Sequence, residues 1–113
     1  MKIPDSTRSS LTLRLLQRQE ERWPDLKDLT VRFRGEYAYI DAATPDSAGE
    51  VEPLFRLRYG GSAAYWGFAI YTYSGMRYEE SILPTGAWEG TPEEALDCAC
   101  GLYLRDPAAW VTN

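Results

Sequence analysis

The sequence predicts an α+β domain in which an antiparallel four- to five-stranded sheet carries an N-terminal and a C-terminal helix on one face. Three observations predict this fold class. The strand segments alternate between apolar and polar residues, which is typical of a sheet covered on one side only. Glycine- and proline-containing turn signals between the strands favour hairpins. One helical segment precedes the strands and another follows them, so the expected order is α-β-β-β-β-(β)-α.

Length and composition fit one globular domain. The chain has 113 residues, of which 44% are hydrophobic and 26% are charged, and we expect a loose polar start at about residues 1–7. No apolar stretch is long enough to cross a membrane and no secretory signal is visible, so we expect a cytoplasmic protein. The net charge of −5 argues against a simple electrostatic nucleic-acid binder, although a local basic patch is compatible with it.

The first helix is predicted over residues 8–22, because apolar residues recur there at helical spacing. One flank of this helix is expected to be apolar and to consist of Leu11, Leu13, Leu15, Leu16 and Trp23. Pro24 ends the helix, since proline lacks the amide donor and disfavours helix in the residue before it.

Alternating residues predict the strands that follow. The expected strands cover residues 29–34, 37–42, 54–59, 65–73 and, as a shorter one, 77–83. Gly35-Glu36 favours a tight hairpin, and Gly60-Gly61-Ser62 favours a second turn. The second helix has the clearest start, because Thr91 is an N-cap followed by Pro92 and, at the third helical position, by Glu94. It is expected to end near Arg105.

The alternation divides the predicted sheet into two faces. The helices are expected to cover the apolar side, formed by Val31, Phe33, Ala38, Ile40, Phe55, Leu57, Trp66, Phe68 and Ile70. The opposite side is the candidate binding surface, called here the arginine–tyrosine face. Its predicted members are Arg32, Arg34, Tyr37, Tyr39, Arg56, Arg58, Tyr71 and Tyr73.

Three interpretations of this face are open. Arginine and tyrosine are good residues for an exposed strand, and cross-strand pairs between them stabilise sheets. The face also suits a protein partner or a homodimer, since a large aromatic patch is seldom left bare. Arginines that hold phosphates beside tyrosines that stack bases would suit a nucleic acid, although the negative net charge places this after a protein partner. Trp88, in a glycine-containing linker, either contacts a partner or folds over the edge of the core, and Trp110 allows the same two interpretations.

The chemistry of the sequence does not favour an enzyme. Histidine is absent, which removes the common nucleophile–histidine pairs and most transition-metal sites. Cys98 and Cys100 point about 200° apart on a helix, so they cannot bind one ion together and are expected to be buried thiols. Glu79 and Glu80 alternate across a strand, so only one of them can face any given site. We therefore expect no catalytic residue, no metal and no cofactor, and keep carboxylate or tyrosine catalysis as the least favoured function.

Four short runs of residues resemble small uncharacterised proteins of actinobacterial type. They are RLRYGG at 56–61, WGFAIY at 66–71, LPTG at 83–86 and TPEEALD at 91–97. The resemblance covers roughly the last two thirds of the chain and implies a bacterial cytoplasmic origin, with no activity, substrate or catalytic residue attached to it. The sequence as a whole predicts a non-enzymatic protein-binding or accessory module that uses the arginine–tyrosine face, with nucleic-acid binding through the same face as the alternative.

Overall fold

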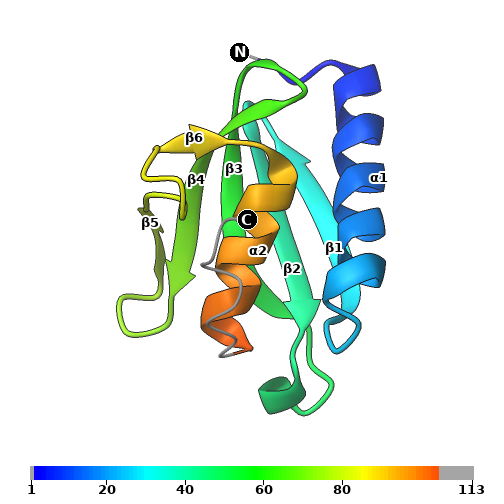
Figure 1. Cartoon of the computed structure of the whole chain (residues 1–113), viewed down its shortest axis with the longest axis vertical. Helices are drawn as coiled ribbons and strands as arrows, with labels where there is room; N and C mark the ends of the chain where they lie inside the picture. Colours follow the sequence, from blue (N-terminus) through cyan, green and yellow to red (C-terminus); the bar gives the residue numbers. More distant parts are fainter. Residues whose placement is uncertain (1, 105–113) are drawn as a thin grey trace.

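The computed structural model describes residues 2–104, and its elements follow the predicted order (Figure 1). The helices are α1 (Asp5–Arg22) and α2 (Pro92–Tyr103). The strands are β1 (Lys27–Arg34), β2 (Tyr37–Ala43), β3 (Glu52–Ser62), β4 (Tyr65–Thr72), β5 (Arg77–Glu80) and β6 (Glu89–Gly90), and a short 3-10 turn, η1 (Pro45–Ser47), lies between β2 and β3.

The strands form one antiparallel sheet in the order β1-β2-β3-β4-β5. The short strand β6, which the sequence does not predict, pairs with Trp66 and Gly67 of β4, beside the stretch of β4 that pairs with β5. β5 and β6 are thus two pieces of one interrupted edge strand, joined by the loop at residues 81–88. Leu83 anchors this loop, because its side chain is only 2% exposed and its backbone N–H donates to the carbonyl of Ala87 at 2.8 Å.

Both helices cover the same face of the sheet, as the sequence predicts (Figure 1). Alternate strand residues such as Phe55, Leu57 and Trp66 are fully buried beneath them. On the edge strand β1, Val31 and Phe33 are only partly buried against this core. The predicted α+β fold is therefore confirmed, and neither α1 nor α2 covers the other side of the sheet.

The packing of α1 differs from the prediction in two respects. The helix begins at Asp5 and Ile3 is 1% exposed, so the segment expected to be a loose start is helical in part and anchored in the core. Leu11 and Leu15 face the sheet, whereas Leu13 is 67% and Leu16 38% exposed, so the predicted flank is wrong for these two residues. Residues two positions apart on a helix point about 200° apart, so Leu13 cannot share a face with its neighbours on either side.

The turn between β3 and β4 also lies elsewhere than predicted. Gly60 and Gly61 belong to β3, where the pairing register shifts and Gly61 takes a φ of +97°. Only glycine adopts such a conformation readily, so the pair forms a β-bulge, and the turn itself falls at Ala63-Ala64. β5 ends at Glu80 rather than at residue 83. The predicted helix end near Arg105 and the predicted contact Trp110 lie outside the described residues.

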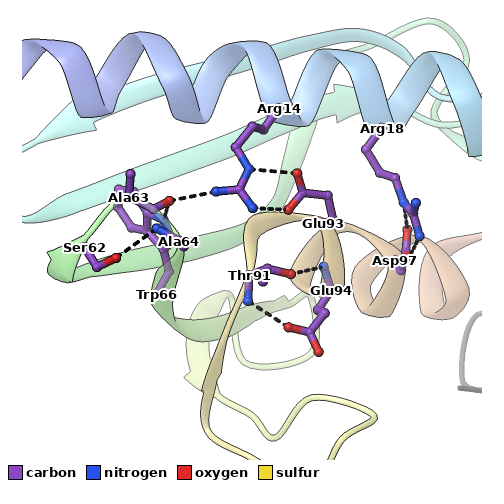
Figure 2. Close-up of polar contacts among 10 residues, drawn as sticks. All are labelled: Arg14, Arg18, Ser62, Ala63, Ala64, Trp66, Thr91, Glu93, Glu94 and Asp97. Atoms are coloured by element: carbon purple, nitrogen blue, oxygen red, sulfur yellow. Dashed lines mark hydrogen bonds and ion pairs between the residues drawn. The ribbon is translucent and has the colours of Figure 1, made fainter.

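Ion pairs join the two helices along a seam (Figure 2). Arg14 holds Glu93 with two hydrogen bonds, from Nε at 2.8 Å and from Nη2 at 2.7 Å. One turn further on, Arg18 holds Asp97 in the same two-pronged way, and the indole N–H of Trp23 donates to that carboxylate at 2.9 Å. Asp97 is 8% exposed, so the seam is a structural contact between α1 and α2.

The start of α2 is the predicted capping box, which the structure confirms (Figure 2). The backbone N–H of Glu94 donates to Thr91 Oγ1 at 3.1 Å, and the backbone N–H of Thr91 donates to Glu94 Oε1 at 2.9 Å. The two bonds satisfy amide donors that the first helical turn leaves unpaired, and they fix where the chain leaves β6.

Candidate binding face

Strand pairing arranges the arginine–tyrosine face in two rows that cross the sheet. The first row, from β1 to β6, is Arg34, Tyr37, Arg58, Gly67 and Glu89. The second row, from β1 to β5, is Arg32, Tyr39, Arg56, Ala69 and Glu80. Each row reads arginine, tyrosine, arginine, small residue, glutamate. Positive charge is therefore gathered over β1 and β3, and negative charge over the edge formed by β5 and β6.

Arg32 has its own partner within the face. Its Nε donates to Asp41 Oδ2 at 2.7 Å, and its guanidinium lies 5.3 Å from the centre of the Tyr39 ring. Asp41 is 9% exposed, and the hydrogen bond to its carboxylate raises the pKa of Arg32. This pair is satisfied inside the fold, so Arg32 has less to offer a partner than the sequence suggests.

Arg56 is held by aromatic rings. Its guanidinium carbon lies 4.5 Å from the Tyr37 ring centre and 5.4 Å from that of Tyr78. Tyr78 of β5 meets the Tyr39 ring edge-on at 5.4 Å and the Tyr71 ring at 5.1 Å. Burial raises the pKa of Tyr78. The centre of the face is thus a packed cluster whose rings contact one another.

Arg34 and Arg58 differ from the other two arginines. Both are exposed, and within residues 2–104 neither forms an ion pair. They lie on either side of Tyr37 in the first row. Arg34 and Arg58, neither paired with a described carboxylate, lie on either side of Tyr37 and make this the part of the face that is best suited to bind an acidic group.

More basic side chains lie at the hairpin between β1 and β2. Lys2, Arg8 and Arg34 line a shallow hollow there together with one acidic residue, Glu36. The Arg8 guanidinium lies 5.3 Å from the Phe33 ring centre, and its buried Nε has no hydrogen-bond acceptor among the described residues. The positive charge of the face therefore continues around the end of the sheet onto the start of α1.

Tyr73 lies apart from the arginines. It follows the last residue of β4, and its hydroxyl donates to the carbonyl of Pro53 at 2.9 Å. Its ring contacts Tyr71 at 5.0 Å on one side and Tyr103 of α2 at 6.1 Å on the other. Tyr103 in turn donates to the backbone carbonyl of Tyr71, and burial raises the pKa of Tyr103 to about 12. Tyr73, a predicted member of the arginine–tyrosine face, therefore packs at the end of the sheet and not beside the arginines.

A pocket of about 170 Å³ opens on the face above β4. Gly67 and Ala69 form its floor. One wall carries Tyr37, Arg56 and Arg58, and the opposite wall carries Glu80, Trp88 and Glu89. Trp88 lines this pocket across from the predicted arginines, and its side chain is 60% exposed. Glu80 faces the pocket while its neighbour Glu79 pairs with Arg77 at 3.2 Å, in line with the predicted alternation.

Sequence reasoning missed several residues of the site. Tyr78, Glu80 and Glu89 belong to it, and so do the two small residues of the floor. One signal was present in the sequence, because Gly67 and Ala69 alternate with the large Trp66, Phe68 and Ile70, and small residues on one side of a strand leave a hollow there. The position of Glu89 could not be read in this way, since β6 is only two residues long.

Other kinds of site receive little support from the described part of the chain. Between residues 2 and 104 no group of three or more histidine, cysteine, aspartate or glutamate side chains is placed to hold a metal ion. Cys98 and Cys100 are free, buried thiols, as predicted, and burial raises the pKa of Cys98 to about 11. No helix among these residues is long and apolar enough to cross a membrane.

Comparison of the chain with protein families, with curated proteins and with solved structures found no match. The resemblance to proteins of actinobacterial type therefore stays a prediction. The arginine–tyrosine face and the pocket above β4 are the features of the molecule that bear on its function.

Proposed function

We propose that this protein is a non-enzymatic binding module whose arginine–tyrosine face holds an acidic segment of a partner protein. The observation that carries the proposal is the pair Arg34 and Arg58, which are exposed, form no ion pair with a described residue and flank Tyr37. Arginine holds carboxylates with two parallel hydrogen bonds, and a tyrosine between two such sites adds apolar contact.

A protein partner fits this face better than a nucleic acid does. Non-specific binders of single strands combine a positive groove with aromatic rings on which bases stack. Here the rings of Tyr39, Tyr71 and Tyr78 pack edge-on against one another, at 5.4 and 5.1 Å. Glu80 and Glu89 border the same face and would repel a phosphate chain that crossed it. A short acidic segment along β1 to β3 avoids both obstacles.

The basic hollow at the β1–β2 hairpin indicates where the segment would continue. Lys2 and Arg8 lie beside Arg34 there and outnumber Glu36, so a segment that leaves Arg58 and passes Tyr37 meets a net positive charge. Electrostatic complementarity of this kind raises the association rate and rejects partners of the wrong charge. We therefore expect binding that weakens as salt is added.

Fluorescence anisotropy with a labelled polyglutamate peptide tests the proposal. We expect the parent protein to bind the peptide at low salt, and Arg34→Glu and Arg58→Glu each to weaken binding by about tenfold or more, because a repelling carboxylate replaces each contact. Arg77→Glu is the matched control. It makes the same charge change at a side chain that is 73% exposed and paired with Glu79, outside the proposed contact.

Three results would count against an acidic protein segment. If the parent fails to bind polyglutamate at low salt, or if Arg77→Glu weakens binding as much as Arg58→Glu, the proposal is wrong. A polydeoxythymidine strand of matched charge, run in parallel, provides the third test. If it binds more tightly than the peptide and loses binding in the same variants, the face is a nucleic-acid site. Light scattering across protein concentrations shows whether the partner is a second copy of the chain.

A further inference from the structure

We propose that the pocket above β4 binds a free zwitterion of the α-amino-acid class, with its carboxylate toward Arg58, its ammonium toward Glu80 and Glu89, and its side chain against Trp88. This ligand goes beyond the acidic partner segment, because it uses the half of the face that carries the glutamates. The inference rests on the charges of the two walls, on the size of the pocket and on the way in which Trp88 is held.

The two walls carry opposite charges that do not neutralise each other. Arg56 and Arg58 line one wall, and Glu80 and Glu89 line the other, yet within the described residues none of these four side chains forms an ion pair. An anion alone would meet the glutamates, and a cation alone would meet the arginines. A ligand that carries both charges satisfies both walls, and each wall then rejects ligands that carry only the like charge.

The pocket suits a small molecule. Its volume of about 170 Å³ is below the range of roughly 300–1,000 Å³ that is typical of sites for drug-sized ligands and cofactors. The floor is formed by the backbone of Gly67 and the methyl group of Ala69, so a ligand can lie directly against β4. A single amino acid matches this space, whereas a nucleotide or a large cofactor does not.

Trp88 provides a fixed apolar surface at the rim. Its backbone carbonyl accepts a hydrogen bond from the N–H of Phe68 at 3.3 Å, and the buried Leu83 anchors the same loop. The backbone is therefore tied to β4 while the indole remains 60% exposed. Exposed tryptophans that are held in this way contribute large contact areas to binding sites at a low entropic cost.

Titration followed by ¹H–¹⁵N NMR spectra tests the proposal with L-leucine, L-glutamine and L-phenylalanine as probes. We expect at least one of them to shift the Gly67 amide and the Trp88 indole N–H. For L-leucine, two blocked analogues separate the two charges: N-acetyl-L-leucine lacks the ammonium group and L-leucinamide lacks the carboxylate. For whichever probe binds, the matching blocked forms are expected to bind about tenfold more weakly or worse, since each leaves one charged wall without a partner.

Matched variants assign the contacts. Glu80→Gln is expected to weaken amino-acid binding about tenfold, whereas Glu79→Gln, its neighbour on the other side of the strand, leaves binding unchanged. Gly67→Val fills the floor without touching the core, because a Cβ added at Gly67 meets only Arg58, at 3.5 Å, and this variant should abolish binding. The folded state of each variant is checked by the dispersion of its NMR spectrum.

Several outcomes would overturn the zwitterion. These are the absence of shifts with all three amino acids, equal binding of a blocked analogue and its parent, and equal loss in Glu79→Gln and Glu80→Gln. The result is separable from partner binding. Arg34→Glu lies outside the pocket and should lose the polyglutamate peptide while keeping the amino acid. Glu80→Gln should weaken binding of the amino acid while keeping the peptide, because it leaves Arg34 and Arg58 unchanged.

Discussion

Two arginines on α1 form ion pairs, whereas two arginines on the open face of the sheet form none with a described residue. On α1, Arg14 and Arg18 each hold a carboxylate of α2 with two hydrogen bonds (Figure 2). On the open face of the sheet, Arg34 and Arg58 are exposed and form no ion pair with a described residue. Residue type alone therefore does not distinguish an arginine that stabilises the fold from one that is available to a partner.

Spacing and burial account for the difference. Arg14 and Arg18 are four residues apart on α1, as Glu93 and Asp97 are on α2, so one helical turn on each side brings two pairs into register. Asp97 is buried, so breaking its ion pair with Arg18 by removing one partner is strongly destabilising. On the sheet, the residues that flank the exposed arginines in their row are tyrosine and glycine, so no carboxylate lies opposite them.

The largest expected effect on stability is at the ion-pair seam between α1 and α2. Asp97→Ala removes the acceptor of Arg18, of Arg22 and of the Trp23 indole N–H, and it leaves the buried indole donor without its partner. We expect a loss of roughly 2–3 kcal/mol in the free energy of unfolding, measured by urea titration. Glu20→Ala is the control, because it removes an exposed carboxylate from α1 and should change stability by less than about 0.5 kcal/mol. Equal effects in the two variants would mean that the seam is no stronger than an ordinary surface pair.

A smaller effect on stability is expected at two glycines, Gly90 on the helix-covered side of the sheet and Gly67 on the open face. A Cβ at Gly90 would lie 2.5 Å from Leu83 Cδ1 and 2.8 Å from Glu94 Oε1, so Gly90→Ala must displace the loop anchor or the capping box. We expect it to cost roughly 1–2 kcal/mol. Gly67→Ala, on the open face, makes only an ordinary contact at 3.5 Å, and should be neutral or stabilise by less than about 1 kcal/mol. A costly Gly67→Ala in the same urea titration would show that the floor of the pocket is tightly packed.

The sequence was sufficient for the features that depend on local patterns. Alternation with a period of two residues predicts that Phe55 and Leu57 face the core and Arg56 the opposite side. Thr91 and Glu94 predict the start of α2. These signals act within a few residues, where the geometry of a strand or a helix end is fixed. The fold class and most members of the arginine–tyrosine face follow from them.

Features that depend on contacts between distant segments could not be predicted in this way. Leu13 and Leu15 are both apolar, and only the position of α1 over the sheet decides which one is buried. The ion-pair partner of Arg32 is Asp41, its diagonal neighbour across the β1–β2 pair, so this contact depends on the register in which the two strands pair. The pocket needs the arginines of β3, the small residues of β4 and the loop at 81–88 at once, so it exists only when the sheet is assembled.

The smallest expected effect is a difference in stability between two arginine variants of the open face. Arg56→Ala removes a guanidinium that lies 4.5 Å from the Tyr37 ring centre and 5.4 Å from that of Tyr78, and should cost roughly 0.5–1 kcal/mol. Arg58→Ala removes an exposed side chain that forms no ion pair with a described residue, and it should change stability by less than about 0.5 kcal/mol in the same urea titration. If Arg58→Ala lowers the free energy of unfolding more than Arg56→Ala does, Arg58 stabilises the fold, as Arg14 and Arg18 do. It would then not be available to bind a partner.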